Sequence, residues 1–147
     1  SAGAKVAFDS NYRPKLWENV AVARRTVQAM WDITDIALPS VDDEMALFGD
    51  LAEAAVIDRF AGRDWDGIAI KRGMRGPVSP GLDLEAHPDF PAAARVIDTT
   101  AAGDSFNGGY LAAFLAGKGE AERLAAGHAL AARVVGAPGA ILPRRDI

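Results

Sequence analysis

Short apolar runs alternate with helix-like segments along this chain, and the alternation limits the folds that the chain can adopt. Runs typical of buried strands occupy residues 5–8, 33–38, 65–71 and 94–97. Apolar residues recur at helical spacing over 16–31, 42–48, 51–60, 103–115 and 121–135. Such a chain forms a parallel or mixed sheet with helices packed against it. We therefore predict an α/β fold, with residues 1–147 forming one domain or most of one.

The first apolar run, KVAFD at residues 5–9, begins within five residues of the N-terminus. A buried strand needs neighbouring strands in its sheet, and almost no chain precedes this run to supply them. We therefore expect that the sequence begins inside a domain.

The composition argues against several classes of function. The 147 residues include no cysteine, which excludes disulfides and thiolate metal sites, and only two histidines, which argues against a multi-histidine zinc site. A net charge of −4 and a pI near 5.1 argue against binding to nucleic acid or to an anionic membrane. No apolar run approaches the roughly 18 residues of a membrane span, and no signal-peptide pattern is present, so we expect a cytoplasmic protein.

The segment DTTAAGD, residues 98–104, is the strongest candidate for a site. It leads into a helix expected to begin near Gly103, and its small side chains leave the backbone accessible. A first helical turn has unpaired N–H groups and the positive end of the helix dipole, so Ala101, Ala102 and Gly103 could bind a phosphate. Asp104 could accept a proton from an attacking hydroxyl group in the same turn.

Plain helix capping is the alternative interpretation of this segment. Asp98, Thr99 or Thr100 would then be the cap, and Asp104 an ordinary first-turn acid. The segment does not match the GxxxxGK[ST] pattern, so it is not a Walker-type loop. The local pattern by itself leaves both interpretations open.

The longer stretch DTTAAGDSFNGGYL resembles the C-terminal signature of the ribokinase-like (PfkB) carbohydrate kinases. That signature usually reads D-T-x-G-A-G-D, and here Ala101 replaces its first glycine. The resemblance implies a ribokinase-like three-layer α/β/α fold with a mostly parallel sheet, of which this chain is the C-terminal portion without the N-terminal half and lid. It also implies that Asp104 is the catalytic base and that Ala101, Ala102 and Gly103 form the anion hole for the γ-phosphate of ATP.

Other segments resemble the family in the expected order. KRGMRG, residues 71–76, is similar to the turn beside the nucleotide, which implies contacts from Lys71, Gly73 and Gly76. His128 stands where many members have an asparagine near the adenine, and Gly139 also lies near the nucleotide in this family. Packing of the histidine within its helix and an ordinary turn glycine are the alternatives.

SVDD, residues 40–43, occupies the place of the family's N-x-x-E motif, which is linked to Mg²⁺ and phosphate. Ser40 replaces the asparagine and Asp43 the glutamate, so the resemblance implies that Ser40 is on the nucleotide side and Asp43 near the metal. Glu44 could replace Asp43 by a shift of one residue. Helix capping by Ser40 and these acids is the alternative.

FDSNYRPKLW, residues 8–17, resembles the corresponding segment of 2-keto-3-deoxygluconate kinases. The resemblance implies a sugar-acid substrate, with Arg13 binding its carboxylate, Asn11 orienting the loop and Asp104 contacting the reacting hydroxyl. Fructokinases share part of this pattern, so a neutral-sugar kinase is an alternative, and an inactive nucleotide-binding fragment is another. The family also makes a homo-oligomer an expectation for the full-length protein.

Overall fold

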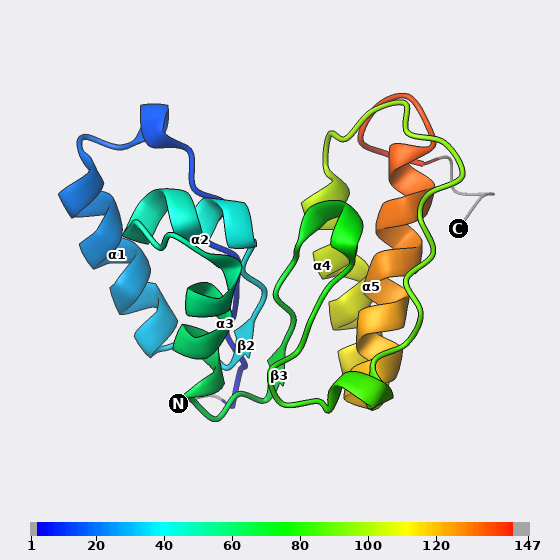
Figure 1. Cartoon of the computed structure of the whole chain (residues 1–147), viewed down its shortest axis with the longest axis horizontal. Coiled ribbons are helices and arrows are strands. Elements are labelled where there is room, and N and C mark those ends of the chain that lie inside the picture. The colour runs from blue at the N-terminus through cyan, green and yellow to red at the C-terminus, as the bar shows by residue number, and fades with distance from the viewer. Residues whose placement is uncertain (1–2, 143–147) are drawn as a thin grey trace. The chain divides into compact units, whose positions relative to one another are not determined.

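The computed structural model describes residues 3–142, and its tertiary contacts divide the chain into two units (Figure 1). Unit 1 consists of the residues up to Arg72 together with Val78–Gly81. Unit 2 consists of Gly73–Pro77 together with the residues from Leu82 onward.

Unit 1 contains a three-stranded parallel sheet in the order β1-β2-β3. The strands are β1 (Ala7–Phe8), β2 (Ile36–Ala37) and β3 (Gly67–Ile68). Their register pairs Ala7 with Ile36, and Ile36 with Gly67. The predicted α/β class with a parallel sheet is therefore confirmed, although each strand is shorter than the apolar run that predicted it.

Three α-helices of unit 1 follow the predicted pattern. They are α1 (Val20–Asp32), α2 (Val41–Phe48) and α3 (Glu53–Ala61), and a short 3₁₀ helix, η1 (Pro14–Leu16), precedes them. The first helix starts four residues later than the periodicity indicates, because the Asn19 side chain accepts a hydrogen bond from the Val22 N–H and caps it there.

Trp31 is the aromatic residue around which the core of unit 1 packs. Its ring contacts Phe8 at a centroid distance of 4.6 Å and Phe60 at 5.0 Å, both edge to face, which is a favoured arrangement of aromatic rings. Trp31 comes from α1, Phe8 from β1 and Phe60 from α3, so one buried side chain joins two helices to the sheet.

Unit 2 is built on two helices, α4 (Ala102–Leu115) and α5 (Glu120–Val135), which pack side by side (Figure 1). Two short 3₁₀ helices, η2 (Gly73–Arg75) and η3 (Leu84–Ala86), precede them. Both long helices begin within one residue of the predicted position and end as predicted. Within residues 3–142, no helix is both long and apolar enough to cross a membrane.

The strand predicted at residues 94–97 is wrong. That segment is irregular, and the N–H of Ile97 donates instead to the Val135 carbonyl at 2.7 Å, at the last turn of α5. Val96 and Ile97 are 56% and 42% exposed, so the apolar run is not buried in a sheet. The segment is therefore held by a helix end and not by a neighbouring strand.

The two helices of unit 2 approach each other through glycines. A Cβ atom added at Gly109 of α4 would lie 2.6 Å from the Ala126 carbonyl oxygen of α5. A Cβ atom at Gly127 of α5 would lie 2.8 Å from the Phe106 ring of α4. Only residues without a side chain fit at these two positions.

We predict opposite effects for alanine at two adjacent positions of α4. Gly109→Ala should lower the free energy of unfolding by about 1–3 kcal/mol, because the new methyl group meets backbone atoms that cannot move aside. Gly108→Ala is the control, since nothing lies within 4 Å of its Cβ position. It should stabilise the protein by about 0.5–1 kcal/mol through the higher helix propensity of alanine. Denaturant unfolding of the three chains measures both, and equal effects would contradict the close helix contact.

Candidate active site

The residues that the sequence singles out are divided between the two units. Unit 1 contains Asn11, Arg13, Ser40, Asp43 and Lys71. Unit 2 contains Gly73, Gly76, Ala101, Ala102, Gly103, Asp104, His128 and Gly139.

An ion pair lies at the carboxyl ends of the strands of unit 1. Asp9 directly follows β1, Ser40 follows β2, and Lys71 lies three residues after β3. The Lys71 ammonium group binds the Asp9 carboxylate, with side chains only 12% and 16% exposed. The backbone of Lys71 also pairs with that of Ser40, and its carbonyl accepts from the Val41 N–H at 2.9 Å. The parallel strands thus bring Asp9, Ser40 and Lys71 to one edge of the sheet. Ser40 and Lys71 are predicted site residues, and Asp9 is the ion-pair partner of Lys71.

Arg13 and Asp43 lie side by side in unit 1. Neither the FDSNYRPKLW segment nor the SVDD segment predicted this contact. The Arg13 Nη1 atom is 3.4 Å from Asp43 Oδ1 and donates to the Tyr12 carbonyl at 3.0 Å. The Arg13 side chain is 57% exposed, so its guanidinium remains accessible to a ligand. The residue expected to bind the substrate and the residue expected near the metal are therefore neighbours.

The environment of Asp43 has opposing effects on its acidity. Burial raises the pKa of the Asp43 carboxyl above its ordinary value, and the Asp9 charge adds to this. The charges of Arg13 and Lys71 and a hydrogen bond from the Tyr12 backbone act in the opposite direction. Removing Arg13 would therefore leave a partly buried carboxyl with a still higher pKa.

The structure at the start of α2 tests two alternatives from the sequence, namely helix capping by Ser40 and a metal role for Glu44 in place of Asp43. Ser40 occupies the N-cap position, but its side chain makes no capping hydrogen bond, so the capping interpretation of Ser40 is wrong. Glu44 is completely buried and accepts a hydrogen bond from Arg59 at 2.8 Å. A buried, paired carboxylate is not accessible to a metal ion, so the shift of the metal role to Glu44 is also wrong. The metal role of Asp43 stays a prediction.

In unit 2, the backbone before α4 leaves the first helical turn uncovered. The N-cap residue is Ala101, in the left-handed region at φ 59°, and no side chain caps the helix. The capping interpretation of Asp98, Thr99 and Thr100 is therefore wrong. Asp104 lies exposed in this first turn. The Ala102 N–H donates to the Thr99 carbonyl at 3.2 Å, but no side chain caps the other N–H groups of this turn, which a helix start can offer to an anion.

Asp98 has a role that the sequence pattern did not reveal. Its Oδ1 atom accepts from the Thr100 N–H at 2.8 Å, and its Oδ2 atom accepts from the Gly139 N–H at 3.2 Å. The carboxylate therefore joins residues 98–101 before α4, which we call the anion loop, to the turn after α5 that contains Gly139. No sequence signal links residues that are 41 positions apart.

Gly76 and His128 come together around Phe90. A Cβ atom at Gly76 would lie 2.6 Å from the Phe90 ring, and the Phe90 and His128 rings are 5.1 Å apart. His128 Nε2 also lies 2.8 Å from the Pro91 carbonyl oxygen. The structure thus shows His128 packed against its neighbours, which was the alternative to a contact with the adenine. Nucleotide contacts by Gly73, Gly76 and His128 stay predictions.

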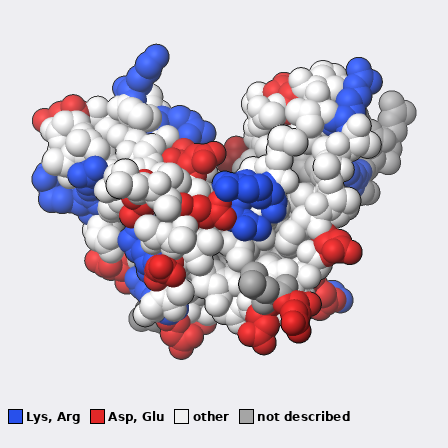
Figure 2. Space-filling model, viewed as in Figure 1, with Lys and Arg blue, Asp and Glu red and all other residues white. Residues whose placement is uncertain are grey.

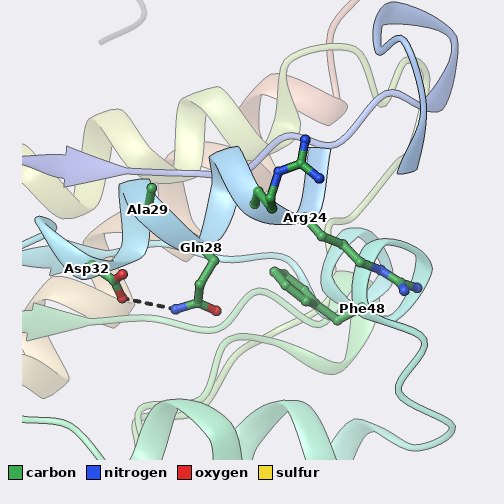
Figure 3. A pocket seen from close by; sticks show the side chains of 6 residues that line it. Arg24, Gln28, Ala29, Asp32 and Phe48 are labelled. Carbon is green, nitrogen blue, oxygen red and sulfur yellow. Dashed lines mark hydrogen bonds between the residues drawn. The ribbon is translucent and has the colours of Figure 1, made fainter. Parts of the chain in front are cut away.

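Neither the distribution of surface charge nor the pocket on α1 marks the predicted site residues. Acidic and basic side chains intermix on the face shown in Figure 2. No cluster of three His, Asp or Glu side chains suited to a metal occurs within the described residues. A pocket on α1, in which Gln28 donates to Asp32 at 3.0 Å, includes none of the predicted site residues (Figure 3).

Comparison with known sequences gives a family and named relatives. Residues 1–147 match the family described as "pfkB family carbohydrate kinase". The chain is 40% identical over 146 residues to 2-dehydro-3-deoxygluconokinase of Escherichia coli (strain K12), and 39% identical over 145 residues to that of Dickeya dadantii (strain 3937). These matches cover 97% and 96% of the chain but 47% and 46% of the relatives, so the chain spans about half their length.

Comparison with solved structures confirms the fold. The aminoimidazole riboside kinase of Salmonella enterica, complexed with aminoimidazole riboside and an ATP analog, is similar with a TM-score of 0.76 and 29% identity. The match covers 95% of this chain and 48% of that one. The predicted ribokinase-like α/β fold is therefore confirmed.

We predict that the Thr100 and Gly139 amides report the titration of Asp98. Hydrogen bonds from the Thr100 side chain and backbone, and from the Gly139 N–H, hold the pKa of Asp98 below its ordinary 3.8. The tie between the loops is therefore complete above that pH and is lost as the pH falls through the lowered pKa. In NMR spectra both amide resonances should shift together with one midpoint below 3.8. Asp98→Asn should abolish this shift, and separate midpoints would contradict a shared carboxylate.

Proposed function

Because the chain belongs to the pfkB family of carbohydrate kinases, we propose that it is the C-terminal portion of an ATP-dependent sugar-acid kinase. The proposed reaction converts 2-keto-3-deoxy-D-gluconate to its 6-phosphate. The uncapped first turn of α4, with Asp104 exposed in it, is the observation that carries the proposal. The relatives named 2-dehydro-3-deoxygluconokinase support this choice of substrate.

The anion loop before α4 supplies the phosphate side of the reaction. Ala101, Ala102 and Gly103 have no bulky side chain, and the left-handed backbone at Ala101 turns the chain directly into the helix. The N–H groups of this first turn donate to the oxygens of the transferring phosphate as negative charge develops on them. Because these donors belong to the backbone, they are in place before the substrate arrives.

Asp104 acts as the general base. Its carboxylate accepts the proton of the 6-hydroxyl group, and the hydroxyl oxygen forms a bond to the γ-phosphorus of ATP. The bond between that phosphorus and the β,γ-bridging oxygen breaks, and ADP leaves with the bonding electrons. Asp104 then holds the proton, which it returns to solvent after the product leaves.

Unit 1 supplies the groups for the sugar acid. The Arg13 guanidinium is exposed and presents a planar pair of donors, which suits a carboxylate. In the described structure this group contacts Asp43, so the substrate carboxylate replaces Asp43 as its partner. Asn11, at φ 39° in the left-handed region, shapes the loop that presents Arg13.

Ser40, Lys71, Gly73, Gly76, His128 and Gly139 form the nucleotide side in this proposal. Asp43 is the candidate to hold Mg²⁺ together with the phosphates, which fits the usual binding of Mg²⁺ by one or two carboxylates and phosphate oxygens. Bound Mg²⁺ would neutralise charge on the transferring phosphate. A cytoplasmic location and a homo-oligomer of the full-length protein belong to the same proposal.

A direct assay tests the proposal. The full-length protein and the 147-residue chain are incubated with ATP and either 2-keto-3-deoxy-D-gluconate, fructose or ribose, and ADP release is measured. We expect turnover of the sugar acid by the full-length protein and little by the chain alone, since positioning supplies most of the catalysis. Turnover of fructose or ribose without turnover of the sugar acid would favour the neutral-sugar kinase. Binding of ATP without turnover of any of the three sugars would favour an inactive nucleotide-binding protein.

We predict that Asp104→Asn lowers kcat by a factor of about 10²–10⁴, because the variant loses its general base. The affinity for ATP should change little, since the asparagine side chain has nearly the same shape. Asp58→Asn, at an exposed position of α3, is the control and should leave kcat unchanged. An Asp104 variant with normal turnover would exclude this residue as the base.

We predict that Arg13→Gln raises KM for the sugar acid by about 10- to 100-fold, because hydrogen bonds to a charged group are lost. KM for ATP should not change. Arg13→Lys should recover only part of the affinity, since an ammonium group cannot bind both carboxylate oxygens in one plane. Arg25→Gln, an exposed position of α1, is the control. Unchanged KM in Arg13→Gln would show that another residue binds the carboxylate.

A further inference from the structure

Asp9 is a largely buried carboxylate with no part in the proposed chemistry, and it begins the loop of residues 9–13 that carries Arg13. We propose that Asp9 is a positioning residue, which joins the backbone of Asn11 to Lys71 so that Arg13 is presented to the sugar acid. The inference rests on the proposed function for its ligand. Its structural part can be tested without any ligand.

The two carboxylate oxygens of Asp9 bind different groups. Oδ1 accepts from the N–H of Asn11, two residues later, at 3.2 Å. Oδ2 accepts from the Lys71 ammonium group, which lies three residues after β3. An aspartate that bonds the backbone N–H two residues on closes a local turn and so sets the direction of the chain. Asp9 therefore shapes the beginning of the loop and attaches it to the end of a second strand.

The residue that Asp9 holds has a strained backbone. Asn11 has φ 39°, in the left-handed region that a residue with a side chain adopts at a cost in energy. Such a conformation persists only where neighbouring contacts maintain it. On the N-terminal side this contact is the hydrogen bond from the Asn11 N–H to Asp9. On the C-terminal side the Tyr12 side chain is 7% exposed and packs in the core of unit 1.

The backbone of this loop also determines where the Arg13 guanidinium lies. Arg13 Nη1 donates to the Tyr12 carbonyl at 3.0 Å, so a change in the loop backbone moves the donors of Arg13. A guanidinium binds both oxygens of a carboxylate only when the two groups lie in one plane. A small displacement of Arg13 therefore weakens the binding of the sugar acid. Asp9 acts on the substrate through Arg13 and does not touch it.

Asp35 provides a matched control at the opposite end of the same strands. It directly precedes β2, its Oδ2 atom accepts from the Val6 N–H at 2.7 Å, and its Oδ1 atom lies 4.0 Å from the Lys5 ammonium group. Like Asp9, Asp35 thus joins a lysine to a backbone N–H next to β1. Val6 precedes β1, whereas the loop of residues 9–13 follows it. A purely structural role predicts similar effects on sugar-acid binding when either aspartate is substituted.

The first experiment measures amide hydrogen exchange, residue by residue, in the 147-residue chain without ligand. Asp9→Ala should speed exchange at Asn11 by about tenfold through local opening and change exchange at Val6 by less than about twofold. Asp35→Ala should have the reverse pattern. Asp9→Asn keeps an acceptor for the Asn11 N–H but loses the charge that binds Lys71, so its effect at Asn11 should be smaller. This variant keeps the test decisive if Asp9→Ala does not fold.

Two outcomes of the exchange experiment would overturn the proposal. One is exchange at Asn11 that is the same in the unsubstituted chain and in the Asp9 variants. The other is an equal increase at Asn11 and Val6 in the Asp9 variants, because such an increase would follow global stability and not the local contact.

The second experiment measures KM and kcat of the full-length protein with 2-keto-3-deoxy-D-gluconate and ATP. Asp9→Asn should raise KM for the sugar acid by about tenfold and change kcat by less than about threefold, since the lost interaction is one of binding. Asp35→Asn should change neither constant by more than about twofold. In an Arg13→Gln background, Asp9→Asn should have no further effect on KM, because both substitutions act through one contact.

An increase in KM that is additive with that of Arg13→Gln would overturn the positioning role, and so would equal effects of Asp9→Asn and Asp35→Asn. An unsubstituted protein that does not turn over the sugar acid contradicts the proposed function. The exchange data in that case still decide whether Asp9 holds the loop of residues 9–13.

Discussion

The ion pair between Lys71 and Asp9 is the interaction on which the site residues of unit 1 depend. It joins the end of β1 to the chain just after β3, and the backbone of Ser40 lies between them. Both side chains are largely buried, so removal of either one would leave the other without its oppositely charged partner in a poorly solvated position, which is destabilising. The loop of residues 9–13 begins at Asp9, and α2 begins after Ser40. The ion pair and the backbone pairing of Ser40 with Lys71 therefore lie where the segments that carry Arg13 and Asp43 begin.

A second constraint acts in unit 2, where backbone geometry replaces side-chain contacts. The helix α4 begins without a cap, although Asp98, Thr99 and Thr100 are all residues that commonly cap helices. Asp98 instead holds the loop to the turn after α5. A side-chain cap would occupy N–H groups of this turn, in which the Ala102 N–H already donates to the Thr99 carbonyl. The N–H groups that no side chain caps are the physical basis for the proposed phosphate site.

Local sequence patterns predicted the helices and the strands of the sheet, which depend on interactions between residues close in the sequence. The helix periods located α4 and α5 closely, and the apolar runs located β1, β2 and β3, because periodic burial leaves a direct trace in the sequence. The run at 94–97 has the same composition as a strand but no partner strand, and partners are not encoded locally. Likewise, the contacts of Arg13 with Asp43 and of Asp98 with Gly139 join distant residues. The burial of Glu44 could not be read from an acidic triplet whose other two members are more exposed.

The close approach of α4 and α5 at Gly109 and Gly127 has a mechanical consequence. At Gly109 the near neighbours are backbone atoms of α5, which have no rotamers, so this contact cannot relax by rearranging side chains. Thermal motion that displaces one helix must displace the other. With Asp98 linking the segments at one end of the pair, the loop before α4 and the turn after α5 should fluctuate as one rigid body.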